Sequence, residues 1–108
     1  MGWRGRRNTA VGDQYKEPLR AIQLAAGASS ASAAITEYGW VGLSIRATGA
    51  NVRYNFNAPA NATTSHYIGQ NERIFITTPY GAGDTTINAI RDASTDGALE
   101  ITVVREFS

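Results

Sequence analysis

Residues 41–57, VGLSIRATGANVRYNFN, alternate between apolar and polar side chains on both sides of a glycine–asparagine turn. Successive side chains of a strand point to opposite faces of a sheet, so this period of two predicts half-buried strands at 40–48 and 52–57. Because "GAN" (49–51) is typical of a tight turn, the two strands are expected to pair as a β-hairpin. The residues predicted to face the core are Val41, Leu43, Ile45, Ala47, Val52, Tyr54 and Phe56.

Comparable runs recur along the chain at spacings of roughly 10–12 residues, with turn residues between them. Residues 27–35, GASSASAAI, fit either a flexible loop or a weak helix, and the connections are too short for crossover helices. We therefore predict an all-β fold of about seven short strands, an antiparallel β-sandwich (jelly-roll or Ig-like) or a small barrel. The further strands are expected at 19–26, 66–69, 72–78, 85–92 and 98–107.

The chain has 108 residues, enough for one domain at most. Residues 19–108 are predicted to form the sandwich, and residues 1–18, which have no regular period, an extended N-terminal arm. The arm is either a disordered terminus or a segment that becomes ordered against a partner. In the second case arginines would bind acidic groups and a tryptophan would anchor the contact. The candidate partner-binding residues are Trp3, Arg4, Arg6 and Arg7.

Composition excludes several kinds of site. Charged residues make up 18% of the chain, and the net charge of +1 gives no reason to expect a polyanionic partner for the whole domain. The chain contains no cysteine, so it has neither disulfides nor thiolate metal sites. No apolar stretch resembles a signal peptide or approaches the roughly 20 residues of a membrane span, so a soluble protein is expected.

Acidic residues beside a glycine in residues 90–104 suggest a calcium loop. Asp92, Ser94, Asp96 and Gly97 match positions 1, 3, 5 and 6 of a helix-loop-helix calcium site. The twelfth position, which needs a glutamate, is Val103. We therefore interpret 95–97 as a hairpin turn in which glycine accommodates a positive φ, with a weak non-helical cation site as the alternative.

No catalytic centre is predicted. The only histidine, His66, follows Ser65 in sequence, but adjacent strand residues face opposite sides of a sheet. No phosphate-binding glycine motif occurs, and a zinc site is improbable with one histidine and no cysteine. We expect no enzyme activity, cofactor, metal or small-molecule substrate.

Polar side chains opposite the predicted core face form a second candidate contact surface. Such faces are usually only solvated, but a face with little charge that is rich in Asn and Thr also suits contact with a partner. Its candidate residues are Arg46, Arg53, Asn55 and Asn57.

Three segments carry a resemblance to a known group of proteins: IRATGANVRYNF (45–56), SHYIGQNERI (65–74) and INAIRDASTDGALEIT (87–102). Through them a little over half of the chain resembles small structural proteins of tailed bacteriophages. The resemblance implies a virion component assembled in the bacterial cytoplasm, most plausibly a capsid decoration or cement protein. Its implied partner is the major capsid protein or another virion subunit, which it would bind as a homo-oligomer or in many copies.

Two alternatives remain open. The first is a structural protein elsewhere in the particle, such as a head–tail adaptor or a tail protein. The second, from a different class, is a β module that binds carbohydrate or nucleic acid; aromatic residues on an open sheet face would serve the latter.

Overall fold

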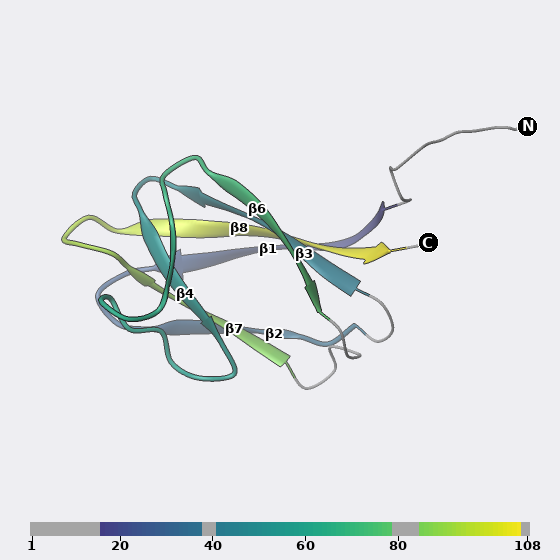
Figure 1. Ribbon diagram of the computed structural model, residues 1–108, viewed down its shortest axis with the longest axis horizontal. Coiled ribbons are helices and arrows are strands. Elements are labelled where there is room, and N and C mark those ends of the chain that lie inside the picture. Colours follow the sequence, from purple (N-terminus) through teal and green to yellow (C-terminus); the bar gives the residue numbers. More distant parts are fainter. Residues whose placement is uncertain (1–15, 38–40, 79–84, 107–108) are drawn as a thin grey trace, which may run out of the picture.

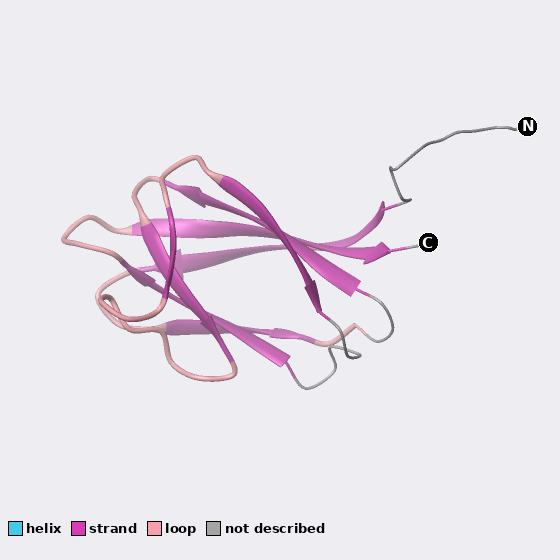
Figure 2. Cartoon of the chain, viewed as in Figure 1, coloured by secondary structure: helices cyan, strands magenta, loops and turns pink. Residues whose placement is uncertain are grey.

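The computed structural model describes residues 16–37, 41–78 and 85–106, and within them every regular element is a β-strand (Figure 2). The prediction of an all-β fold is confirmed. The eight strands are β1 (Lys16–Ala26), β2 (Ala31–Ile35), β3 (Val41–Thr48), β4 (Val52–Phe56), β5 (His66–Ile68), β6 (Arg73–Thr78), β7 (Thr85–Arg91) and β8 (Gly97–Glu106).

The strands form two four-stranded sheets that face each other as a sandwich (Figure 1). Sheet A has the order β1-β8-β3-β6 and sheet B the order β2-β7-β4-β5, and all strand pairs within them are antiparallel. This order is that of a jelly roll, in which the chain repeatedly crosses from one sheet to the other. Of the two sandwich topologies left open by the sequence, the structure has the first.

The first two strands differ from their predicted bounds. β1 begins at Lys16, so residues 16–18 of the predicted arm pair with the end of β8, and a bulge lies between Pro18 and Arg20. Residues 31–35 of the supposed loop or weak helix are strand β2, which pairs with β7. A small-residue sequence has low intrinsic preference for a strand, and here pairing with β7 decides its conformation. The sandwich therefore has eight strands, two of which, β1 and β8, are long.

The predicted hairpin at 41–57 is wrong. β3 lies in sheet A and β4 in sheet B, so the turn at 49–51 carries the chain across the sandwich. Gly49 adopts a left-handed φ of 80° there, a conformation that glycine reaches without steric cost. The end of β3 bonds instead to the β5–β6 connection, where Asn71 N donates to Ala47 O over 2.7 Å. The alternation of apolar and polar residues identifies the buried face of each strand. It is equally compatible with a turn that forms a hairpin and with a turn that carries the chain to the facing sheet.

The turn at 92–96 also crosses the sandwich, because β7 belongs to sheet B and β8 to sheet A. A turn is present as predicted, but it does not form a hairpin. Gly97 is needed for a different reason from the one expected: a Cβ at this position would lie 2.8 Å from the carbonyl oxygen of Thr48. Close approach of two backbones, and not a positive φ, requires glycine there.

The core lies between the sheets and follows the predicted alternation. Val41, Leu43, Ile45 and Ala47 of β3 are fully buried, and they pack against Val52 of β4. The inward residues of β8 and the remaining core positions extend the same cluster: Leu24, Ala26, Ile35, Tyr54, Ile68, Ile87, Ala89, Leu99, Ile101 and Val103. Burial of these apolar side chains is the main source of stability in a fold of this kind.

An ion pair closes one side of the sandwich, where the edge strands β1 and β2 lie next to each other. Arg20 Nε and Nη2 donate to the two carboxylate oxygens of Glu37 over 2.8 and 3.1 Å, and Nη2 also donates to Ala34 O. These hydrogen bonds lower the pKa of Glu37 and raise the pKa of Arg20 relative to their usual values. The bidentate contact holds the edge of sheet A to the edge of sheet B.

Candidate functional site

The predicted polar contact face is divided between the two sides of the molecule. Arg46 is on the outer face of β3 in sheet A, whereas Arg53 and Asn55 are on the outer face of β4 in sheet B. Outward side chains of facing sheets point away from each other. These residues therefore do not form one surface, and the grouping based on a hairpin is wrong.

Arg53 links three parts of sheet B. Its Nε donates to Asp92 Oδ1 over 2.8 Å, and its Nη1 donates to the carbonyl oxygen of Ser65 over 3.0 Å. The guanidinium also lies 5.0 Å from the ring centroid of Tyr67, within cation–π range. Only 25% of its side chain is exposed. Arg53 thus holds the β7–β8 turn and the start of β5 to β4, and this internal role accounts for its position.

Replacing Arg53 by methionine is expected to lower the free energy of unfolding by about 1–2 kcal/mol, because Asp92 loses a charge-assisted hydrogen bond in a half-buried place. Arg46 is the matched control, since it is more exposed and its contact with Glu100 is longer, at 3.6 Å. Arg46→Met should change stability by less than about 0.5 kcal/mol. Urea denaturation of both variants measures the difference, and equal losses would contradict this role of Arg53.

The two asparagines of the predicted face bond within the chain. Asn55 Oδ1 accepts from the backbone N–H of Phe56 over 3.0 Å. Asn57 adopts a left-handed φ of 61°, and its Oδ1 accepts from Thr86 N while its own N–H donates to Thr86 O. Asn57 therefore ends β4 by satisfying the neighbouring backbone of β7, as a short amide side chain can at such a position.

Ser65 and His66 do not combine as a nucleophile and a base. The Ser65 hydroxyl accepts from Asn61 N over 2.8 Å, and the residue is largely buried. His66 is exposed, and its ring lies 5.2 Å from that of Tyr54. Burial, and secondarily the charge of Glu72, raises the pKa of Tyr54. The arrangement stabilises the β4–β5 connection and offers no proton-transfer pair at these residues.

Arginines bind the acidic side chains of the suspected calcium loop. Asp92 is bound to Arg53, and Asp96 Oδ1 accepts from Arg91 Nη1 over 2.8 Å. Each cation opposes binding of a metal ion to the same carboxylate. Within the described ranges, no three His, Cys, Asp or Glu side chains gather as metal ligands. These residues form a turn, as predicted, but the turn crosses between the sheets and is not the predicted hairpin.

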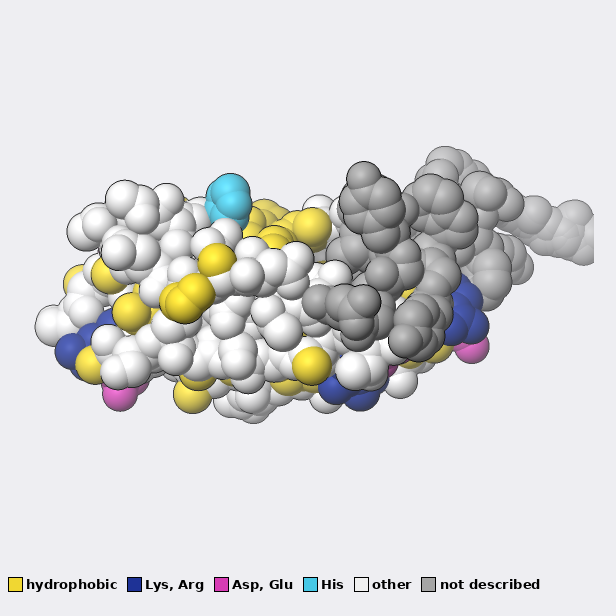
Figure 3. Space-filling view, turned by 90° about the horizontal axis from the view of Figure 1, so that it is seen from below, with side chains coloured by type: hydrophobic (Ala, Val, Ile, Leu, Met, Phe, Trp, Pro, Cys, Tyr) yellow, Lys and Arg dark blue, Asp and Glu magenta, His cyan; other side chains and the backbone are white. Residues whose placement is uncertain are grey.

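The outer face of sheet B is partly covered by the β4–β5 connection, residues 57–65. Ala60 N donates over 2.9 Å to the hydroxyl of Ser30, which directly precedes β2 at the opposite edge of the sheet from β5. Asn61 stiffens the connection by accepting from both the N–H and the hydroxyl of Thr63. Asn88, an outward residue of β7, is consequently only 7% exposed. On this side, the backbone and side chains that are neither charged nor hydrophobic make up much of the described surface, with small hydrophobic areas among them (Figure 3).

The outer face of sheet A has short side chains along much of β1 and β8, whereas β6 adds Arg73 and the exposed aromatic residue Phe75, which pairs with Ser44. On the neighbouring strands β1, β8 and β3, Ala21 pairs with Thr102 and Thr102 with Ser44, and in the next row Gln23 pairs with Glu100 and Glu100 with Arg46. A shallow groove of 390 Å³ runs between β1 and β8. We call this surface the sheet A face, defined by Ala21, Gln23, Ala25, Ser44, Arg46, Thr48, Arg73, Phe75, Ala98, Glu100 and Thr102.

The sheet A face carries an excess of positive charge on one side. Arg46 on β3 pairs with Arg73 on the edge strand β6. Arg46 has Glu100 as its ionic partner, whereas Arg73 donates to the hydroxyl of Ser44 over 2.8 Å and has no carboxylate partner among the described residues. An acidic group of another molecule can therefore approach Arg73.

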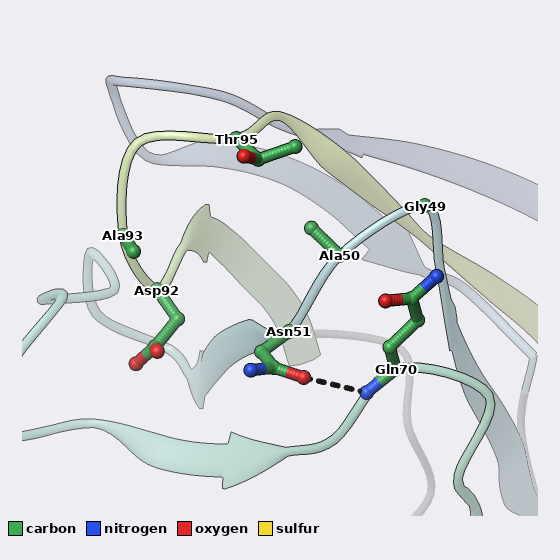
Figure 4. Close-up of a pocket in the computed structure, with 7 residues that line it drawn as sticks. All are labelled: Gly49, Ala50, Asn51, Gln70, Asp92, Ala93 and Thr95. Atoms are coloured by element: carbon green, nitrogen blue, oxygen red, sulfur yellow. Dashed lines mark hydrogen bonds between the residues drawn. The ribbon is translucent and has the colours of Figure 1, made fainter.

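A second hollow lies at the end of the sandwich where three connections meet (Figure 4). Its volume is 210 Å³, and it lies between the β3–β4, β5–β6 and β7–β8 connections. Asn51 Oδ1 accepts from Gln70 N over 2.8 Å and so joins two of them. We call it the loop-end pocket, lined by Gly49, Ala50, Asn51, Gln70, Asp92, Ala93 and Thr95.

Sequence analysis missed both hollows. Most residues of the sheet A face come from strands whose alternation is visible, but their grouping depends on β8 lying between β1 and β3. The loop-end pocket brings together residues up to 46 positions apart, from Gly49 to Thr95. Turn residues at 49–51 and 92–97 were the only signal for the pocket. The predicted arm residues lie outside the described ranges: Trp3, Arg4, Arg6 and Arg7.

No protein-family model matches the chain, and no curated protein or solved structure matches it significantly. The part of the chain that the structure describes has no helix of the length and apolar character that would cross a membrane.

Proposed function

We propose that this protein is a structural component of a tailed-bacteriophage particle that adheres to the major capsid protein as a decoration or cement protein. The contact is made through the sheet A face. The observation that carries this proposal is the difference between the two outer faces, because the chain's own β4–β5 connection crosses one and the other presents exposed short side chains.

The small side chains exposed along β1 on the sheet A face favour docking against a flat surface of a partner protein. Ala21, Gln23 and Ala25 are exposed along β1, and Glu100 is exposed on the neighbouring β8. Alanines lose no side-chain entropy when they are covered, so ordering this surface costs little. A partner backbone can also approach short side chains closely, which favours dense packing at the centre of an interface.

Charge specifies the kind of surface that fits. Arg73 lacks a carboxylate partner among the described residues, and the chain has a net charge of +1. A capsid subunit that places an Asp or Glu opposite Arg73 would gain a charge-assisted contact and a defined orientation. The arm, with Trp3, Arg4, Arg6 and Arg7, is proposed to extend the contact to a neighbouring subunit.

Location in the particle rests on the resemblance of residues 45–102 to phage structural proteins, together with the jelly-roll order of the strands, which is frequent in viral capsid domains. Weak contacts repeated over a shell bind strongly as a set. A decoration protein is therefore expected in hundreds of copies per particle, whereas an adaptor or tail protein would occur as a single closed ring. Quantitative mass spectrometry of purified particles distinguishes the two.

A large side chain placed on the sheet A face should weaken docking without unfolding the protein. Ala21→Trp is expected to weaken binding to purified capsids by about tenfold or more, because an extra side chain in a packed contact costs about 1–3 kcal/mol. Arg73→Glu should also weaken binding by reversing the charge that faces the partner. Ala34→Trp is the matched control, since Ala34 is likewise an exposed alanine on an outer face, but of sheet B. Capsid occupancy is measured by co-sedimentation.

Equal occupancy for Ala21→Trp and Ala34→Trp would remove the sheet A face from the proposal. Deletion of residues 1–12 tests the arm in the same assay. Undiminished occupancy of that variant would leave the sheet A face as the sole contact. Thermal denaturation of each variant, which should match the parent protein, separates lost docking from lost folding.

A further inference from the structure

We infer that the loop-end pocket is a binding site for one ring of a neutral saccharide. The pocket is separate from the outer face of sheet A, because it is formed by the connections at one end of the sandwich. It therefore adds a ligand-binding activity to the proposed structural role.

Four polar side chains of the pocket have hydrogen-bonding groups left over. Gln70 and Thr95 make no side-chain hydrogen bond to any described residue, and both are exposed. Asn51 uses its Oδ1 to accept from Gln70 N, and its Nδ2 donates to no other residue that the structure describes. Asp92 uses one carboxylate oxygen for Arg53, and within the described ranges its second oxygen accepts no hydrogen bond. The lining thus offers both hydrogen-bond donors and acceptors, as a ligand carrying hydroxyl groups requires.

Electrostatics exclude charged ligands. Asp92 is the only ionisable residue in the lining, and its charge is balanced by Arg53 at 2.8 Å. A cation would meet the guanidinium next to the carboxylate, and an anion would meet the free carboxylate oxygen. A hydroxyl group can donate to that oxygen and accept from the amides, so a neutral polyol is the ligand that satisfies the pocket.

Size and shape indicate a single ring. The open hollow of 210 Å³ is smaller than the roughly 300–1,000 Å³ of pockets for drug-sized ligands, which limits its ligand to about one ring. Ala93 is exposed in the lining and supplies a methyl group that the C–H face of a sugar can cover. In Figure 4 the amide of Gln70 turns back toward Ala50, and the Asn51 nitrogen points toward Asp92.

The site is partly preorganised. The hydrogen bond from Gln70 N to Asn51 ties the β3–β4 and β5–β6 connections, and the one from Asp92 N to Asn51 O, at 3.2 Å, ties the β3–β4 and β7–β8 connections. Arg53 fixes the Asp92 carboxylate from the other side. Binding then costs little ordering of the protein. A shallow site for one ring still gives weak affinity, with a Kd of about a millimolar, which many copies on one surface would strengthen.

Amide chemical shifts of the full chain test the inference directly. A panel of methyl glycosides of neutral hexoses, deoxyhexoses and N-acetylhexosamines is titrated into the labelled protein. We expect at least one of them to shift the amide signals of residues 49–51, 70 and 92–95, and to leave those of the sheet A face unchanged. Gln70→Ala and Thr95→Ala should each weaken binding by about three- to tenfold, the loss of one hydrogen bond.

Gln23→Ala is the matched control, because Gln23 is an exposed glutamine on the sheet A face with no side-chain hydrogen bond to any described residue. It should bind the glycoside as the parent protein does. Absence of shifts at the pocket for every member of the panel at about 100 mM, far above the expected millimolar Kd, would overturn the inference. Binding that survives the double variant of Gln70 and Thr95 would overturn it as well.

Discussion

Replacing Leu43 by alanine is expected to lower the free energy of unfolding by about 2–5 kcal/mol. Leu43 is fully buried at the centre of β3, where it packs in the core between the two sheets. The substitution removes apolar surface from the core and leaves a cavity, since the surrounding strands can relax only in part. Such a loss is a large fraction of the roughly 5–15 kcal/mol that stabilises a domain.

Ile76→Ala is the matched control for this prediction. Ile76 is the direct partner of Leu43 across the β3–β6 pair, but it lies on the edge strand and is only partly buried. Its truncation should cost clearly less, because solvent can occupy the space that it leaves. Urea denaturation curves measure both losses, and a larger loss for Ile76 than for Leu43 would show that the core is centred elsewhere.

Replacing Gly97 by alanine is expected to lower the free energy of unfolding by about 1–3 kcal/mol, the usual cost of forcing an extra methyl group into a packed place. The new Cβ would lie 2.8 Å from Thr48 O, 3.2 Å from Ala50 N and 3.3 Å from Ala50 Cβ. Two of these three atoms belong to the backbone, so the start of β8 must move away from the β3–β4 turn. Thermal denaturation should show a decrease in Tm of about 4–8 °C for each kcal/mol.

Gly27→Ala separates this clash from the general effect of replacing a glycine. A Cβ at Gly27 would meet Asp96 Oδ1 at 3.9 Å, an ordinary contact, and its φ is not in the left-handed region. Alanine there should leave Tm unchanged or raise it slightly, because the unfolded chain loses freedom. If both glycines respond alike, the close approach at Gly97 does not limit stability. The Gly97 variant should also perturb the loop-end pocket, because the displaced turn contains Gly49, Ala50 and Asn51.

How far the fold could be predicted differs from strand to strand. β3, β4 and β8 alternate clearly in sequence, and the buried faces of β3 and β4 were predicted residue by residue, whereas β6 was predicted as a strand without an assigned face. β2 was missed because ASAAI has neither alternation nor β-branched residues before Ile35. Its conformation comes from pairing with β7, a contact between residues 50 or more positions apart. Local sequence carries no trace of such a partner.

The candidate sites were harder to predict than the strands. Arg46 and Arg53 alternate in the same way and looked like one surface, but they face opposite sides of the sandwich because β3 and β4 belong to different sheets. Asp92 and Asp96 resembled calcium ligands, and the structure pairs each with an arginine. In both cases the sequence shows the types of residue present, but the residues that contact them in space are known only from the structure.

The sequence by itself determined that this protein is built of β-strands, and which side of most of them is buried, because hydrophobic burial imposes a period of two that local sequence must carry. Only the tertiary structure decided where each turn leads. A glycine–asparagine turn can return a strand to its own sheet or carry it to the facing one, and both leave the same side chains buried. Pairing between strands distant in sequence decided that these turns cross to the facing sheet. The same pairing determines the position of the outer face of sheet A and of the loop-end pocket.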